Sequence, residues 1–144
     1  MGSYHKHRLT AAQQLFMLKR TAICRGDGAL HHHRLIWEFP VTPSPLSRTY
    51  RVKIEHEELS TPKVFVIDPD LHVLADGRKL PHIYASHPPR LCLYLPGTKE
   101  WSSELLIAMT IVPWTYMWLF YFEEWLLSND WKGGGEHPES NDDE

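Results

Sequence analysis

The stretch TYRVKIEHEELSTPKVFVI, residues 49–67, decides the fold class. In its first part Tyr50, Val52 and Ile54 alternate with polar side chains, which predicts a strand with one buried face. Its last part, PKVFVI at 62–67, is almost continuously apolar and predicts a second strand. Upstream, RLIWEFPV at 34–41 predicts another. The middle of the chain is therefore expected to be a run of strands.

Helices are expected on both sides of these strands. Thr10 is placed to cap a helix that runs to about Ile23. After the strands, residues 71–96 show no regular period and predict an irregular segment. Strands followed by helices predict an α+β domain, with an antiparallel meander sheet on which the helices pack.

Two helices are predicted beyond the irregular segment. Ser102 or Ser103 caps the first, which ends near Thr110. Pro113 suits the first turn of a second helix, or a kink in one long helix. A stripe of aromatic residues at helical spacing predicts a core face: Trp114, Trp118, Phe122 and Trp125. Tyr116 and Trp131 lie outside this stripe and are expected to be left for a partner.

The same region raises the question of a membrane anchor. Residues 105–122 carry no charge, and eighteen residues reach the lower edge of a transmembrane span. Pro113 interrupts the run, and Glu123 and Glu124 close it without a cluster of basic residues. We expect buried helices and no membrane contact, with a membrane-anchored protein as an alternative.

Composition fits one folded domain, because 42% of the 144 residues are hydrophobic and 23% are charged. We expect this domain over residues 9–132, between a flexible N-terminus, 1–8, and a flexible glycine-rich and acidic tail, 133–144. A net charge of −3 argues against a nucleic-acid partner. Two cysteines make no disulfide framework, and the N-terminus lacks the apolar core of a signal peptide. A cytoplasmic location is therefore expected.

Cys92 is the first candidate for chemistry. It lies in LCLYL, residues 91–95, where a cysteine is often only a small buried hydrophobe. In a strand, however, alternation puts Leu91 and Leu93 on one face and Cys92 on the other. A nucleophilic cysteine that carries an acyl group needs a thiolate and an accessible groove. The residues alone leave both interpretations open. Cys24 has no comparable context and is interpreted as structural.

The histidines near Cys92 do not define a cysteine hydrolase. His82 and His87 precede Cys92, but the stretch between His82 and Cys92 contains no Asn or Asp and no peptidase signature. The run HHH at 31–33 does not predict a metal site, because neighbouring side chains of a strand point to opposite faces. These three are expected on the surface beside a turn. We expect neither a metal nor a cofactor.

Several strings together resemble the ubiquitin-conjugating-enzyme (UBC) family. TYRVKIEHEELSTPKVFVI resembles the family's third strand, its loop and the Pro-Pro-Lys-Val entry to the next strand. LCLYL resembles the string around the active cysteine, and Trp101-Ser102 resembles the Trp-Ser-Pro-x-Leu helix entry. The match covers about residues 9–127. The resemblance implies a UBC-like fold in which Cys92 forms a thioester.

One motif departs from the family's pattern. The family carries His-Pro-Asn eight residues before the cysteine, whereas His82-Ile83-Tyr84 begins ten residues before Cys92 and the asparagine is absent. By this resemblance His82 and Tyr84 hold the irregular loop through hydrogen bonds, as the family's histidine does, and Tyr84 is also a candidate donor to the developing oxyanion. Both are therefore predicted site residues beside Cys92.

The strings PHIY and PPRLCLYLPG, with GGGEHP near the end, resemble the stand-alone conjugating-enzyme-like proteins of bacterial CBASS antiphage operons. That resemblance implies a partner, the C-terminal tail of a cGAS-like nucleotidyltransferase, and transfer from Cys92 to a lysine amine on a separate target or on the enzyme itself. No GxxxxGK loop occurs, so activation of the carboxylate with ATP is expected elsewhere. The alternative is a non-catalytic adaptor that binds the partner's tail.

Overall fold

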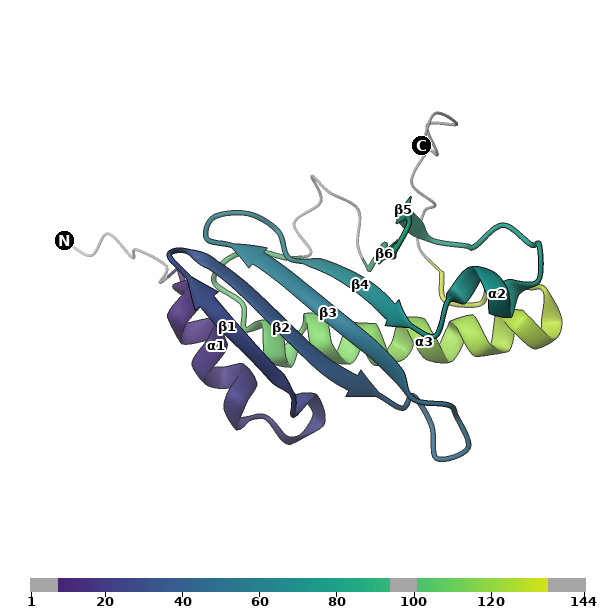
Figure 1. The fold of residues 1–144 in the computed structure, drawn as a ribbon, viewed down its shortest axis with the longest axis horizontal. Helices are drawn as coiled ribbons and strands as arrows, with labels where there is room; N and C mark the ends of the chain where they lie inside the picture. Colours follow the sequence, from purple (N-terminus) through teal and green to yellow (C-terminus); the bar gives the residue numbers. More distant parts are fainter. Residues whose placement is uncertain (1–7, 94–100, 135–144) are drawn as a thin grey trace.

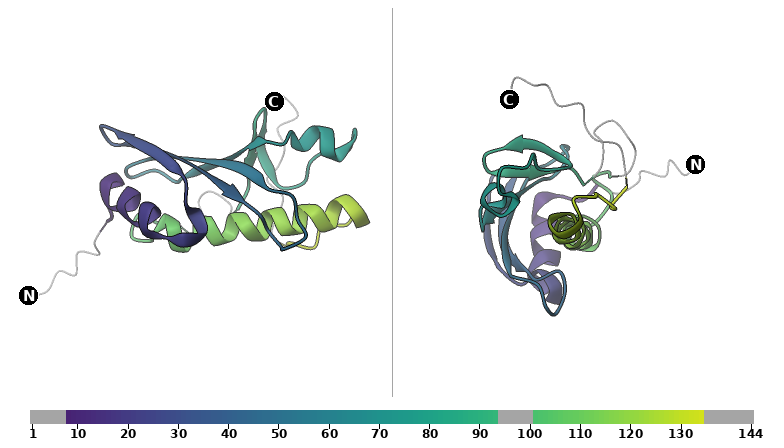
Figure 2. Two further views of the ribbon diagram at one scale, coloured as in Figure 1. Left: turned by 60° about the horizontal axis from the view of Figure 1, so that its bottom comes forward. Right: turned by 90° about the vertical axis from the view of Figure 1, so that its right-hand side faces the viewer.

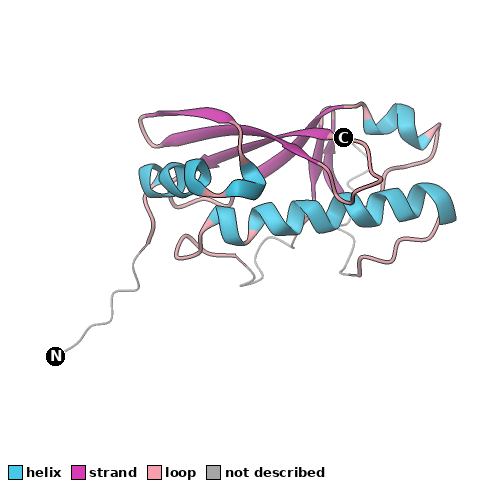
Figure 3. Ribbon diagram, turned by 90° about the horizontal axis from the view of Figure 1, so that it is seen from below, coloured by secondary structure: helices cyan, strands magenta, loops and turns pink. Residues whose placement is uncertain are grey.

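The computed structural model describes residues 8–93 and 101–134, and over these ranges the chain is an α+β domain (Figure 1). Six strands form one antiparallel sheet in the order β1-β2-β3-β4-β6-β5. The sheet curves around helices α1 and α3, which lie on the same face (Figures 2 and 3). The elements are α1 (Ala11–Arg20), the 3-10 turn η1 (Ala22–Cys24), β1 (Asp27–His31), β2 (Arg34–Val41), β3 (Tyr50–Glu57), β4 (Lys63–Asp68), α2 (Leu71–Ala75), β5 (Ile83–Ser86), β6 (Pro89–Leu91), the 3-10 turn η2 (Ile107–Met109) and α3 (Ile111–Ser128).

The first helix begins where the sequence predicts and ends earlier. The Thr10 hydroxyl accepts from the Gln13 N–H at 3.1 Å, and the Gln13 side chain accepts from the Thr10 N–H at 2.8 Å. These two bonds form a capping box that satisfies N–H groups which the helix leaves open. The helix ends at Arg20 because Thr21 is extended, and the expected last turn to Ile23 is a 3-10 turn instead.

Three predicted strands are confirmed to within one residue. Along β2 and β3 every second side chain is buried, and the two strands pair in antiparallel register, with Trp37 opposite Ile54. Val52 of β3 lies opposite Val66 of β4. The buried faces of these strands form the sheet's contribution to the core: Leu35, Trp37, Phe39, Val41, Tyr50, Val52, Ile54, Val64 and Val66.

Strand β1 lies outside the predicted run of strands. It begins in CRGDG, residues 24–28, whose glycines allow an edge strand to lie against β2. A Cβ on Gly28 would stand 2.1 Å from the Ile36 carbonyl oxygen, and one on Gly26 would stand 1.9 Å from that of Glu38. These glycines therefore serve close backbone approach.

The segment 71–96 was expected to be irregular; its described part, residues 71–93, is only partly irregular. Asp70 caps the short helix α2, its carboxylate accepting from the His72 N–H at 2.9 Å. Strands β5 and β6 then form a hairpin that extends the sheet beyond β4. Strands of three and four residues broken by prolines are too short to show a period, which is why the pattern concealed them.

The prediction of a helix from Ser102 or Ser103 to about Thr110 is wrong. Only the 3-10 turn η2 forms there, because the buried Gln14 side chain takes the backbone groups that a helix would use. Its amide donates to the Leu105 carbonyl and accepts from the Ile107 N–H, both at 2.8 Å. One side chain of α1 therefore fixes the chain immediately before α3.

Helix α3 confirms the prediction of a second helix with Pro113 in its first turn. Trp118, Phe122 and Trp125 are buried, with ring centroids 5.5 and 5.8 Å apart along the stripe, and Trp114 is half-buried. Within residues 8–93 and 101–134, no helix is long and apolar enough to cross a membrane. The aromatic stripe serves the core.

His56 is a buried polar group at the end of β3. It is 1% exposed, neither ring nitrogen has a hydrogen-bond partner within the described part of the chain, and its ring packs edge-on against Trp101 at 5.6 Å. Burial lowers the pKa of His56, and the Glu58 carboxylate opposes this only in part. The ring is therefore held in its neutral form.

We predict that His56 makes the fold sensitive to acid. Because its pKa is lowered on folding, its contribution to stability is complete above the unfolded value of about 6.5 and is lost as the pH falls below it. His56→Phe keeps the ring shape, so the unfolding free energy at pH 7.5 should be unchanged or higher by about 1 kcal/mol. Urea unfolding between pH 7.5 and 5 should then show a weaker decline for the variant. Parallel declines would contradict the prediction.

Candidate functional site around Cys92

Cys92 follows directly after β6 and is held by its backbone. Its N–H donates to the His82 carbonyl at 2.9 Å, one position beyond the pair Ile83–Leu91 of the hairpin. Leu91 is buried and Cys92 is 5% exposed. The alternation expected through LCLYL therefore does not continue past Leu91, because the strand ends there. Tyr94 and Leu95 lie outside the described residues.

His82 joins three parts of the molecule. Its backbone has a φ of 47°, in the left-handed region that few non-glycine residues adopt. Its carbonyl accepts a second bond from the Trp118 indole N–H at 3.1 Å. Its ring stacks on Trp131 with centroids 5.1 Å apart and planes 22° apart. This one residue therefore links the start of β5 to Cys92, to α3 and to the chain beyond α3.

Tyr84 lies in the same hairpin, at an irregularity in the pairing of β5 and β6. The ring is half-buried and has the Arg90 guanidinium 4.7 Å from its centroid. A guanidinium over an aromatic face is an attractive contact that fixes the orientation of the ring. Arg90, which the sequence analysis did not single out, therefore positions Tyr84. The only sequence signal for Arg90 was its position two residues before Cys92, and an arginine near a cysteine is too common to predict a functional residue.

Two aromatic residues expected to be left for a partner are used within the chain, so that expectation is wrong. The Tyr116 hydroxyl donates to the Ile23 carbonyl. The Trp131 ring contacts Trp118 and Tyr121, at 5.4 and 6.1 Å, as well as His82. The acidic, glycine-rich composition around Trp131 predicts no packing, because the contacts of its ring depend on where α3 ends.

Cys24 differs from Cys92 in its surroundings. It is completely buried in the core, and its Sγ lies 3.5 Å from the carbonyl oxygens of Leu18 and Thr21, which share its one proton as acceptors. Burial raises the pKa of the Cys24 thiol to about 11, so the group stays protonated at neutral pH. These surroundings are those of a residue that packs in the core.

The remaining histidines lie elsewhere. His87 packs its ring against His72 of α2, with centroids 4.7 Å apart. His31, His32 and His33 are exposed around the β1–β2 turn, as predicted. Among the residues that the structure describes, no group of three His, Cys, Asp or Glu side chains could hold a metal ion.

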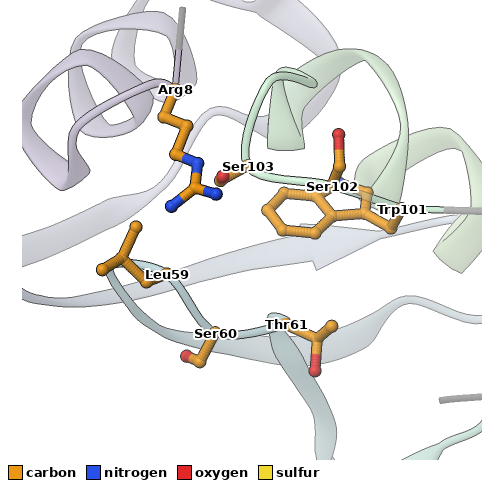
Figure 4. Close-up of a pocket in the computed structure, with 7 residues that line it drawn as sticks. All are labelled: Arg8, Leu59, Ser60, Thr61, Trp101, Ser102 and Ser103. Atoms are coloured by element: carbon orange, nitrogen blue, oxygen red, sulfur yellow. The ribbon is translucent and has the colours of Figure 1, made fainter. Parts of the chain in front are cut away.

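A separate hollow of about 230 Å³ lies between the β3–β4 loop and the chain that precedes η2 (Figure 4). The guanidinium of Arg8 lies beside the Ser103 hydroxyl, and the Trp101 ring points toward both (Figure 4). Its lining is Arg8, Leu59, Ser60, Thr61, Trp101, Ser102 and Ser103. None of the three predicted site residues lines it, so this hollow is distinct from the site around Cys92.

The fold and the site define a small α+β protein with one cysteine in its core and a second held at a strand end by a histidine-bearing turn. The model of the family described as Type II CBASS E2 protein matches residues 13–138, most of the chain. The chain belongs to this family, which confirms the resemblance to the stand-alone CBASS proteins and supports a role in CBASS defence. No curated protein matches the chain.

We predict that the His82 ring stabilises the loop that carries Cys92. His82→Ala removes the ring that stacks on Trp131, and the free energy of unfolding should fall by about 1–3 kcal/mol. His87→Ala, at an exposed position of the same segment, should change it by less than about 0.5 kcal/mol. Urea unfolding of both variants provides the measurement, and equal effects would show that His82 has no special structural role.

Proposed function

We propose that the chain is a ubiquitin-conjugating-enzyme-like acyl transferase of CBASS defence, with Cys92 as its nucleophile. Family membership over residues 13–138 is the observation that carries the proposal. The element order supports it: an N-terminal helix, a meander of β1 to β4, a cysteine-bearing segment and a C-terminal helix are what a UBC-like fold requires. The donor is the C-terminus of a cGAS-like nucleotidyltransferase, the partner that the CBASS context implies.

The chemistry is a two-step transfer. The Cys92 thiolate adds to the carbonyl carbon of an acyl donor already activated as a thioester; the new C–S bond forms, and the donor's thiolate leaves with its electron pair. A lysine amine then adds to the Cys92 thioester. The C–S bond breaks, its electrons return to sulfur, and the amine's proton passes to solvent. The product is an amide on a lysine of a target or of this chain.

Each neighbouring residue has a different proposed role. His82 fixes the backbone of Cys92 through its carbonyl, and so acts as a positioning residue. The Tyr84 hydroxyl donates to the oxyanion that develops when the carbonyl is attacked, in place of the family's asparagine. Arg90 holds the Tyr84 ring in orientation for that bond. This division of roles follows the general rule that an oxyanion donor must be fixed before the reaction.

One observation favours a second candidate function, a non-catalytic adaptor that binds the partner's tail. Cys92 is 5% exposed, whereas a nucleophile that receives an acyl group from another protein must be reached by it. In the adaptor the cysteine is a packing residue, and binding of the tail is the whole function. The two proposals differ in whether a covalent link to Cys92 forms.

We predict a thiol-labile adduct on Cys92 when the chain is co-expressed with the native nucleotidyltransferase and its activating partner. Intact mass under non-reducing conditions should show the adduct, and hydroxylamine or a thiol reductant should remove it. Cys92→Ser should give a more stable ester, because an alkoxide is the poorer leaving group, and Cys92→Ala should give none.

Cys24→Ala is the matched control and should leave the adduct unchanged, because Cys24 is sealed in the core. Binding of the partner's tail by Cys92→Ala should persist. Full phage protection by Cys92→Ala would overturn the nucleophile and support the adaptor.

We predict that Tyr84→Phe slows transfer without unfolding the chain. Loss of one oxyanion donor typically lowers the rate by about a hundredfold or more, while the ring and its contact with Arg90 are kept. Single-turnover formation of the Cys92 adduct gives the rate. Tyr116→Phe, which loses a hydrogen bond to the Ile23 carbonyl away from the site, should transfer at the normal rate. An unchanged rate for Tyr84→Phe would remove this residue from the mechanism.

A further inference from the structure

The last described residues fold back over the site. Helix α3 ends at Ser128. The next residue, Asn129, is left-handed with a φ of 59°, and the following chain runs back along the helix (Figure 3). The turn is fixed locally: the Asn129 N–H donates to the Trp125 carbonyl at 2.7 Å, and the Asp130 N–H donates to the Ser128 hydroxyl at 3.1 Å. This end of the chain therefore has a defined path.

Trp131 follows that turn, and the next residues pack closely around its side chain. Its indole N–H donates to the Gly134 carbonyl at 3.3 Å. A Cβ on Gly133 would stand 2.8 Å from the Trp131 ring. Any larger residue at this position would require the Trp131 ring to shift. Residues 131–134, which we call the strap, are therefore shaped around one aromatic side chain.

The strap lies against the residues that hold Cys92. Trp131 stacks on the His82 ring at 5.1 Å and contacts the Trp118 ring at 5.4 Å. Trp118 and Cys92 in turn both donate to the His82 carbonyl. The Trp131 ring thus contacts the residue that supplies this carbonyl, His82, and one of its two donors, Trp118. Cys92, whose backbone N–H is the other donor to this carbonyl, is 5% exposed.

We propose that the strap is an autoinhibitory device that keeps Cys92 closed, and that it leaves His82 and Trp118 before a donor reaches the sulfur. The inference rests on the proposed function for its biological meaning, since it concerns access to the same cysteine. It identifies a regulatory step ahead of acyl transfer: release of Trp131 from its aromatic contacts.

The strap is built to open without unfolding the domain. It contributes no strand or helix, and three of its four residues are exposed, with only Trp131 half-buried. Segments with few buried contacts open at a small fraction of the global unfolding free energy. Opening therefore breaks the ring contacts of Trp131 with His82, Trp118 and Tyr121, while its hydrogen bond to Gly134 lies within the strap and the sheet and α3 remain folded.

Alkylation of the full chain by N-ethylmaleimide tests the strap directly, with intact mass and peptide mapping to assign the cysteine. Trp131→Ala should accelerate labelling of Cys92 by about tenfold or more, because local opening governs access to a buried group. Cys24 reports global unfolding in the same molecule, since it is completely buried in the core. It should stay unlabelled while Cys92 reacts.

Two further variants complete the test. Leu127→Ala removes a side chain that is 92% exposed near the end of α3 and should leave labelling of Cys92 unchanged. Gly133→Ala forces the Trp131 ring to move without removing an apolar side chain, and should accelerate labelling of Cys92 if Trp131→Ala does not fold. An unchanged Cys92 rate in a folded strap variant, or labelling of Cys24 in step with Cys92, would overturn the proposal.

The reagent needs no donor, so this result is independent of the proposed transfer. If Cys92 is alkylated faster in the strap variants but forms no adduct on co-expression, the strap proposal stands and the acyl-transferase proposal is refuted. If the adduct forms but the alkylation rate of Cys92 is the same in all variants, the acyl-transferase proposal stands and the strap proposal is refuted.

Discussion

The carbonyl oxygen of His82 is the constraint on which the site depends. It accepts N–H groups from the end of β6 and from the middle of α3, two elements that meet only after the sheet and helix have packed. His82 has a left-handed φ, its carbonyl accepts from both donors, and its ring stacks on Trp131. The backbone around Cys92 is therefore fixed by tertiary structure rather than by a local turn motif.

Local periodicity was enough to predict the elements that depend on local burial. The alternating stretch that became β3, the apolar run of β4 and the capping residue Thr10 were recognisable because each has its signal within a few residues. The chain before α3 was mispredicted for the opposite reason. There, Gln14 competes with helical hydrogen bonds from more than ninety residues away, and no local pattern reports that contact.

The candidate site divides in the same way. Cys92, His82 and Tyr84 were predicted because strings near them resemble a known family, and the structure places all three on one hairpin and its end. Trp131 was assigned to a partner and Arg90 was not singled out. Their contacts with His82 and Tyr84 depend on how α3 ends and on the offset between β5 and β6. The sequence around Trp131 or Arg90 does not predict these contacts.

Cys24 and Cys92 are nearly equal in exposure and opposite in what covers them. Cys24 is enclosed by the first helix and the sheet and donates its thiol to backbone carbonyls, so exposing it means breaking the core. Cys92 lies at a strand end, and its backbone is bonded to His82, whose ring stacks on Trp131 of the strap. The free energy needed to expose a group is set by the cooperative unit that covers it, and a strap is a far smaller unit than a core. Burial in a static structure therefore argues against a nucleophilic Cys24 much more strongly than against Cys92.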